Sequence, residues 1–248
     1  SNVVSRYEVL HLHFLMTMSV SGWELPLLKR LGRRLVFHYR GCEARDPDLN
    51  ARLHPEANLC EDCDYDREAC TDPLIRRRRR LARRYGDVFL ATTPDLRDFV
   101  PEAVHFPFFA PETEAAPPPR TRDDGDPLRL VHVTNHPGLE GTDRIREAVE
   151  RLRANGHAID FVCLHGVPPE RVLDELGRAD LSIGKMKMGY YANAQIESMI
   201  QGVPAITYVR PEFMTDALRE SGFIVTTLDR LEETIAYYLQ HPEALEAK

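Results

Sequence analysis

Residues 179–205 carry the sequence ADLSIGKMKMGYYANAQIESMIQGVPA. The short apolar run Leu181–Ile183 predicts a strand, and a loop that holds two lysines and two tyrosines follows it. Asn193–Gln201 then predicts a helix, which Gly202-Val203-Pro204 ends, and a new strand begins at Ala205. Two strands joined through a helix predict parallel strands in one sheet, because a parallel pair needs such a crossover.

The same alternation extends on both sides of this stretch, from residue 128 to the end of the chain. The predicted strands are Leu128–Thr134, Ile159–Leu164, Leu181–Ile183, Ala205–Val209 and Phe223–Thr226. The predicted helices are Gly141–Asn155, Pro168–Ala179, Asn193–Gln201, Pro211–Ser221 and Leu228–Leu239. Regular β and α alternation is typical of a doubly wound parallel sheet.

The first half of the chain has the same pattern with longer interruptions. Its predicted strands are Tyr7–Phe14, Arg34–Tyr39, Asp87–Ala91 and Ala103–Phe106, and its predicted helices are Glu24–Leu31 and Leu74–Tyr85. Residues 112–127 contain three consecutive prolines and several charges, which predicts a linker. The sequence therefore predicts an α/β protein with domains at 1–111 and 128–248, a linker at 112–127 and a cysteine-rich insertion at 42–72.

Composition excludes several classes of protein. Hydrophobic residues make up 43% of the 248 residues and charged residues 29%, as in an ordinary globular protein. The net charge of −7 argues against general nucleic-acid binding, which needs a basic surface. The sequence has no apolar run of about 20 residues, so no transmembrane segment is predicted.

Two loops of the second domain are candidates for ligand binding, because ligands bind beyond the carboxyl ends of parallel strands. Thr134–Thr142 contains Asn135 and His136, and Gly184–Asn193 contains Lys185 and Lys187. Amide groups at a helix start together with lysines suit a phosphate. The alternative is an ordinary connection with solvated lysines and a tyrosine packed on the surface. Glu197 is the only acid on its helix, and a carboxylate at that depth would accept hydrogen bonds from sugar hydroxyls.

The stretch 179–205 resembles the donor-site signature of retaining GT-B glycosyltransferases, the family-four-like group also called glycosyl transferases group 1. In that signature an acidic helix residue is followed by a small residue, Met and a Gly-x-Pro turn, as in Glu197-Ser198-Met199 and Gly202-Val203-Pro204. Leu128–Asp143 resembles the strand, loop and helix that open the same domain. In the first half, the resemblance to the acceptor-side domain covers His11-x-His13, Arg40-Gly41 and Thr92-Thr93-Pro94-Asp95-Leu96.

This resemblance implies a GT-B-like fold of two Rossmann-like domains, each with a parallel sheet, of which the N-terminal one is incomplete. It implies transfer of a hexosyl or related sugar from a nucleoside diphosphate sugar, with retention and without a metal. Glu197 would bind the ribose hydroxyls, and the amides of Gly189, Tyr190 and Tyr191 would hold the diphosphate or sugar. The other implied positions are His13 and Lys185 as catalytic residues, and Asn193, Asn135, His136 and Lys187 as donor-binding residues.

Three positions depart from the family pattern. Gly189 stands where the family has a second Glu, eight positions before the ribose-binding one. Asn135 and Glu140 stand where the family has the Arg and Lys that neutralise the diphosphate, and Lys185 and Lys187 would replace that charge. The departures favour an alternative function, a non-catalytic relative that binds a sugar nucleotide or a glycan.

Four cysteines lie close together in the first half, Cys42, Cys60, Cys63 and Cys70. Their spacing is consistent with one structural zinc site, although it is not that of a standard finger. Disulfides and free thiols are the alternatives, and a cytoplasmic setting argues against disulfides.

Arg76–Arg80 is a run of five arginines on the predicted helix Leu74–Tyr85. It suits polyphosphate, an anionic acceptor or a membrane surface, whereas the simpler interpretation is a solvated helix face paired with the acidic segment Glu61–Asp72. A third functional hypothesis, an interaction module stapled by zinc, would use this run. The sequence overall predicts a bacterial, cytoplasmic transferase whose acceptor is a small molecule, a glycan or a lipid-linked molecule. Peripheral association with the inner membrane face is an alternative location.

Overall fold

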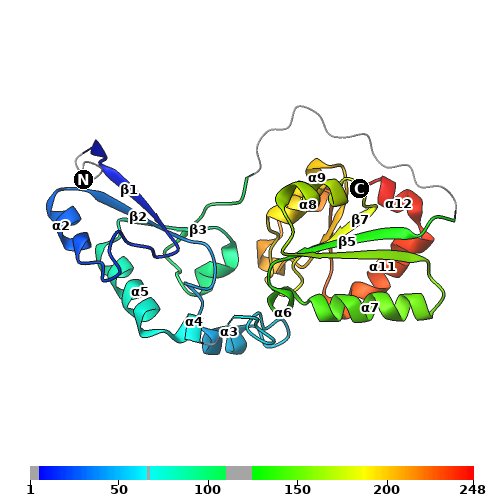
Figure 1. The fold of residues 1–248 in the computed structure, drawn as a ribbon, viewed down its shortest axis with the longest axis horizontal. Coiled ribbons are helices and arrows are strands. Elements are labelled where there is room, and N and C mark those ends of the chain that lie inside the picture. The colour runs from blue at the N-terminus through cyan, green and yellow to red at the C-terminus, as the bar shows by residue number, and fades with distance from the viewer. Residues whose placement is uncertain (1–5, 66–67, 110–124) are drawn as a thin grey trace. The chain divides into compact units, whose positions relative to one another are not determined.

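The computed structural model describes residues 6–65, 68–109 and 125–248 (Figure 1). The chain divides into two compact units, the first comprising 1–55 and 65–108 and the second 56–64 and 109–248. The segment Glu56–Asp64, part of the predicted cysteine-rich insertion, therefore belongs with the second unit. Most of the predicted linker 112–127 falls outside the described residues.

The first unit contains a four-stranded parallel sheet in the order β1-β2-β3-β4. Its strands are β1 Val9–His13, β2 Arg34–Tyr39, β3 Val88–Ala91 and β4 Val104–His105. Its helices are α2 Glu24–Arg30, α3 Pro47–Leu53, α4 Glu68–Thr71, α5 Pro73–Tyr85 and the 3-10 turn η1 Pro94–Asp98. All four strands and both helices predicted here are present, whereas α3, α4 and η1 were not predicted.

The core of the first unit forms between this sheet and its helices. Leu35, Phe37 and Tyr39 alternate along β2 and are buried, together with Leu25 and Leu28 from α2. A buried ion pair joins Arg45 to Asp95, with 2.6 Å between Nη2 and Oδ2. Because both side chains are about 95% buried or more, the pair ties the loop after β2 to the turn after β3.

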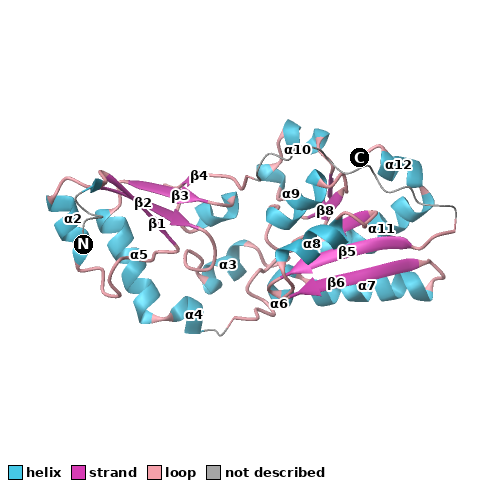
Figure 2. Ribbon diagram, turned by 45° about the horizontal axis from the view of Figure 1, so that its top comes forward, coloured by secondary structure: helices cyan, strands magenta, loops and turns pink. Residues whose placement is uncertain are grey.

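The second unit contains a five-stranded parallel sheet in the order β6-β5-β7-β8-β9. Figure 2 shows its first two strands, β6 and β5, side by side. Its strands are β5 Leu128–Thr134, β6 Ile159–His165, β7 Leu181–Ile183, β8 Ala205–Thr207 and β9 Phe223–Val225. Its α-helices are α6 Pro137–Glu140, α7 Thr142–Ala154, α8 Pro169–Leu176, α9 Asn193–Ile200, α10 Asp216–Glu220, α11 Leu231–Gln240 and α12 Pro242–Glu246, and its 3-10 turns are η2 Pro211–Phe213 and η3 Leu228–Arg230.

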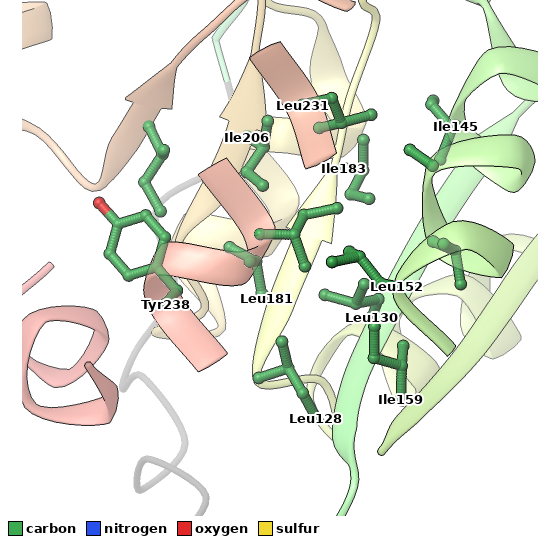
Figure 3. Packing of buried hydrophobic residues seen from close by; sticks show 14 of the residues in the cluster. Leu128, Leu130, Ile145, Leu152, Ile159, Leu181, Ile183, Ile206, Leu231 and Tyr238 are labelled. Carbon is green, nitrogen blue, oxygen red and sulfur yellow. The ribbon is translucent and has the colours of Figure 1, made fainter. Parts of the chain in front are cut away.

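Helices cover both faces of this second sheet. On one face, α7 and α11 pack on Leu128, Leu130 and Leu181 (Figure 3). On the other face, Val131 of β5 and Leu176 of α8 belong to a separate buried cluster. Neighbouring residues of β5 thus face opposite layers, as strand geometry requires. The α/β fold with a parallel sheet in each half is confirmed, and the second sheet is doubly wound as predicted.

One predicted helix of the second unit is wrong. Pro211–Ser221 divides into the 3-10 turn η2 and the helix α10, because Met214 has an extended backbone. Thr215 caps α10, and its hydroxyl accepts a hydrogen bond from the Leu218 amide at 3.3 Å. A threonine cap that starts a new helix explains the break.

Candidate functional site

The carboxyl edge of the second sheet has a topological switch point between β5 and β7. From β5, the chain first adds β6 on one side and then crosses to add β7 on the other. Ligands bind at such a point in open α/β sheets. Because β5 and β7 are hydrogen-bonded neighbours, the two predicted ligand loops lie beside each other. The Met186 amide in one loop donates to the Glu140 carbonyl in the other at 3.2 Å.

The charges of these two loops neutralise each other. Lys185 Nζ lies 2.8 Å from Glu140 Oε1, and the Glu140 side chain is only 4% exposed. The second oxygen, Glu140 Oε2, is buried without a hydrogen-bond partner in the described structure. Glu140, which stands where the family has a basic residue, is therefore paired with Lys185, and the charge of that lysine is shared with it.

The second lysine of the loop is held by backbone carbonyls. Lys187 Nζ donates to the Glu61 carbonyl at 2.6 Å and to the Gly138 carbonyl at 3.2 Å, and it lies 3.8 Å from Asp62 Oδ2. Its side chain is 8% exposed. Lys187 thus ties the two loops to the segment Glu56–Asp64.

That segment packs closely on the loop after β5. The Asp64 carboxylate accepts a hydrogen bond from the Gly138 amide at 2.9 Å and 3.0 Å to its two oxygens. A Cβ added to Gly138 would lie 1.7 Å from the Asp62 carbonyl oxygen. No local sequence pattern predicts this contact, because the two segments are more than 70 residues apart in the chain.

Gly189 has no room for a side chain. Its φ of +81° favours glycine, and an added Cβ would lie 2.6 Å from Arg210 Cγ. The Gly189 carbonyl also accepts a hydrogen bond from the Arg210 amide at 3.0 Å. An arginine therefore covers the position where the family pattern has a second Glu. Arg210 follows β8 at the same sheet edge, and its position just after the predicted strand Ala205–Val209 is the sequence signal for it, although it was not predicted.

Replacing Gly189 with Ala should destabilise the protein by about 2 kcal/mol, because the new Cβ meets both a left-handed backbone and Arg210. Gly202→Ala is the matched control, since Gly202 has φ +73° and no atom within 4 Å of an added Cβ. Urea unfolding should show a loss about 1 kcal/mol larger for Gly189→Ala. Equal losses would mean that the Arg210 contact contributes nothing.

The two tyrosines after Gly189 form an aromatic stack. Tyr190 and Tyr191 have ring centroids 4.3 Å apart, and Tyr191 stacks on Phe223 at 4.9 Å. Burial and a hydrogen bond with Tyr191 raise the pKa of Tyr190. Tyr190 is 7% exposed, so its ring packs inside the unit while its backbone belongs to the ligand loop.

Glu197 lies one turn into α9 and is half-buried. Gln195 and Ser198 form the buried side of this helix. Burial raises the pKa of Glu197 above its ordinary value. Within the described part of the chain, this carboxylate has no hydrogen bond or ion pair. Burying a carboxylate without a partner lowers the stability of a protein. Such a carboxylate is also free to accept hydrogen bonds from a ligand.

The remaining predicted donor residues take up separate positions on the same sheet edge. Asn193 is the first residue of α9 and is exposed, as is Asn135 after β5. His136 is half-buried, and its amide donates to Thr134 Oγ1 at 3.2 Å. The two loops and α9 therefore bring the predicted donor residues of the second unit to one edge of its sheet.

His13, the predicted catalytic residue of the first unit, belongs to a cluster of histidines. His11 and His13 lie on β1, and His38 is the register partner of His13 on β2. Ring centroids are 4.2 Å apart for His11 and His13 and 5.1 Å apart for His13 and His38. Burial, together with the neighbouring His13, His11 and Arg40, lowers the pKa of His38 to about 4. His38 is therefore neutral at pH 7. His38 was not among the predicted residues, because only the strand pairing brings it beside His11 and His13.

The four cysteines of the predicted zinc site divide between the two units. Cys42 and Cys70 are in the first unit, whereas Cys60 and Cys63 are in the second. A hydrogen bond from Cys70 lowers the pKa of Cys42 to about 6, and the Arg45 charge acts in the same direction against burial. All five cysteines lie in the described residues and none forms a disulfide there. The zinc site stays a prediction.

The arginine run lies on α5, where its side chains point to different partners. Arg79 donates to the carbonyls of Glu43, Cys42 and Arg45, and Arg76 donates to the Thr71 carbonyl. A cavity of about 520 Å³ on this helix is lined by Pro73, Arg76, Arg79, Arg80 and Arg83. Part of the run thus anchors the loop after β2 rather than forming a purely solvated face.

Comparisons with known proteins give the class of fold. No protein-family model and no curated protein sequence matches this chain. Among solved structures, a sucrose-phosphate synthase from Thermosynechococcus elongatus is similar, with 12% identity over 97% of this chain and 66% of that chain and a TM-score of 0.59. A TarM variant from S. aureus, in complex with fondaparinux, α-GlcNAc-glycerol and UDP, is similar with 10% identity over 89% of this chain and 48% of that chain, and a TM-score of 0.54.

A second crystal structure of TarM has 12% identity over 90% of this chain and 52% of that chain, with a TM-score of 0.52. The chain spans about half to two thirds of the length of these proteins. They are GT-B glycosyltransferases, and their likeness together with the two parallel sheets shows that this chain has the GT-B fold. In the described residues, no helix has both the length and the apolar character needed to cross a membrane.

Proposed function

We propose that this chain is part of a glycosyltransferase that transfers a sugar from a nucleoside diphosphate sugar to an acceptor. The observation that carries the proposal is Glu197, a half-buried carboxylate without a protein partner in the described structure, beside the switch point of a GT-B-type sheet. Vicinal ribose hydroxyls would donate to the two oxygens of this carboxylate. The GT-B neighbours support the class of reaction, and one of them was crystallised with UDP.

The diphosphate would lie over the loop Gly184–Ala192. There the amides of Gly189, Tyr190 and Tyr191 would donate to phosphate oxygens, with Asn193 at the start of α9 beside them. Positive charge would come from Lys185, Lys187 and Arg210, which supports transfer without a metal at the diphosphate. Stabilising the charge that develops on the leaving diphosphate is the largest contribution such residues make.

The remaining roles are inferred from the resemblance. Asn135 and His136 would contact the donor from the loop after β5, and His13 would face the acceptor from the first unit. We propose retention of anomeric configuration and a hexosyl or related sugar. The acceptor would be a small molecule, a glycan or a lipid-linked molecule, and a bacterial protein of this kind would act in the cytoplasm or at the inner membrane face.

A second function, donor binding without turnover, is supported by the pairing of Lys185 with Glu140 and by the Asp64 carboxylate on the Gly138 amide. Both contacts reduce the positive potential that a leaving diphosphate needs. Incubation with UDP-, GDP- and ADP-sugars, followed by measurement of released nucleoside diphosphate, separates the two. Release above that of a Glu197→Ala variant supports the enzyme. Binding without release supports the second function.

A further inference from the structure

Three imidazoles meet on one face of the first sheet, at its carboxyl edge. His11 and His13 are two residues apart on β1 and therefore point to the same side, and His38 lies beside them on β2. One nitrogen from each ring can be chosen so that the three nitrogens all lie within 4.8 Å of one another. Among the His, Cys, Asp and Glu residues that the structure describes, no other set of three has ligand atoms this close.

The closest pair of ring nitrogens already has the spacing of metal ligands. His11 Nε2 and His38 Nδ1 are 3.2 Å apart. Two nitrogens bound to a tetrahedral zinc ion at about 2.0–2.1 Å are about 3.3 Å from each other. These two nitrogens are hydrogen-bonded in the structure, so an ion would replace the proton that they share and lie to one side of the line between them, with a modest turn of each ring.

Thr92 orients the ring of His38. Its hydroxyl donates to the Tyr39 carbonyl at 3.2 Å and lies 3.1 Å from His38 Nε2. A hydroxyl has one proton, so Thr92 Oγ1 accepts from His38 Nε2–H. This leaves the lone pair on His38 Nδ1, which faces His11. Metal-bound histidines commonly have such a partner on their other nitrogen.

His13 supplies the third ring and has an unsatisfied atom. Its Nδ1 is buried and has no hydrogen-bond partner in the described structure. Its ring centroid lies 4.2 Å from that of His11 and 5.1 Å from that of His38. His13 Nδ1 is therefore a buried nitrogen that is available to a ligand on the side of the cluster.

We propose that His11, His13 and His38 bind one divalent transition-metal ion of the zinc class, with a coordination position left open. Three imidazoles and no carboxylate select zinc, cobalt, nickel or copper over magnesium or calcium. Three protein ligands with an open fourth position are typical of zinc sites that bind water or a ligand oxygen.

The open position would favour an anionic oxygen, because the positive field of Arg40 reaches both His13 and His38. The carboxyl edge of a parallel sheet is also where a ligand binds. The site is contained in the first unit and does not depend on the proposed function.

The test is zinc titration of the full chain, made without a histidine tag and stripped with a chelator. Calorimetry of the variant with Cys60→Ser and Cys63→Ser, which lacks the predicted cysteine site, should show one ion bound at pH 7.5 with a dissociation constant below about 1 μM. Because His11 is exposed, His11→Ala should leave the circular dichroism spectrum unchanged and weaken binding by at least about 100-fold. His241→Ala, which removes an exposed histidine outside the cluster, should have no effect.

Two further variants test whether the zinc is bound by the histidines and not by the cysteines, and whether the orientation of the His38 ring matters for binding. Cys60→Ser with Cys63→Ser should keep the titration, and the cobalt-loaded form of this double variant should show visible d–d absorption without thiolate charge transfer. Thr92→Val should weaken zinc binding about 10-fold, since it releases the His38 ring. The absence of binding, or binding that His11→Ala leaves unchanged, would overturn the proposal.

Discussion

Replacing Glu197 with Ala should weaken donor binding by roughly 100-fold, the largest effect expected in the second unit. A hydrogen bond to a charged group contributes about 1.5–3 kcal/mol, and two ribose hydroxyls would share this carboxylate. A loss of about 3 kcal/mol corresponds to somewhat more than two powers of ten in Kd. Isothermal titration of both proteins with the same sugar nucleotide measures the difference.

Glu246→Ala is the control for this substitution, because Glu246 is an exposed acid on α12 in the same unit. Its Kd should equal that of the unchanged protein. Because burial raises the pKa of Glu197, donor affinity should fall on acidification at a higher pH than for an ordinary Glu. An unchanged Kd for Glu197→Ala would refute the assigned role.

Replacing Lys185 with Met should lower the stability of the protein by about 2 kcal/mol. The substitution leaves the Glu140 carboxylate buried, with its other oxygen already lacking a hydrogen-bond partner in the described structure. Removing one member of a buried pair costs roughly 3–5 kcal/mol, and the partial exposure of Lys185, 29%, reduces this value. Urea unfolding followed by circular dichroism measures the change.

A double-mutant cycle isolates the ion pair. Glu140→Gln in the Lys185→Met background should restore about 1 kcal/mol or more, because the orphaned charge is then gone. Losses that simply add would show that the two side chains do not interact. The cycle reports on stability alone, so it separates the structural effect of Lys185 from its proposed contact with the diphosphate.

The regular parts of the second unit could be predicted closely. β5 and β7 have the predicted ends, and α9 ends one residue earlier than predicted. The ends of these elements are marked in the local sequence, where Gly and Pro stand on either side of apolar runs. The break at Met214, which separates η2 from α10, was not predicted. A threonine is a common residue inside a helix as well as at its cap, so Thr215 alone does not reveal the start of α10.

The sequence indicates which residues lie at the candidate site, and their roles stay predictions, but it does not indicate the partners of the charged side chains. The two loops follow from the rule for parallel sheets, and Glu197 was predicted as the only acid on its helix and by resemblance to the family signature. The partners of the charged residues do not follow from either, because Lys187 meets Glu61 from a segment 126 positions away and His38 reaches His11 across a strand pairing. Contacts between distant segments depend on packing that no local pattern specifies.

The central claim is that the second unit has a nucleotide-sugar site. The most direct measurement is isothermal titration of the full chain with UDP-, GDP- and ADP-sugars under identical conditions. The account predicts saturable binding of at least one of these nucleotide classes. Failure of all three to bind at millimolar concentration would contradict it.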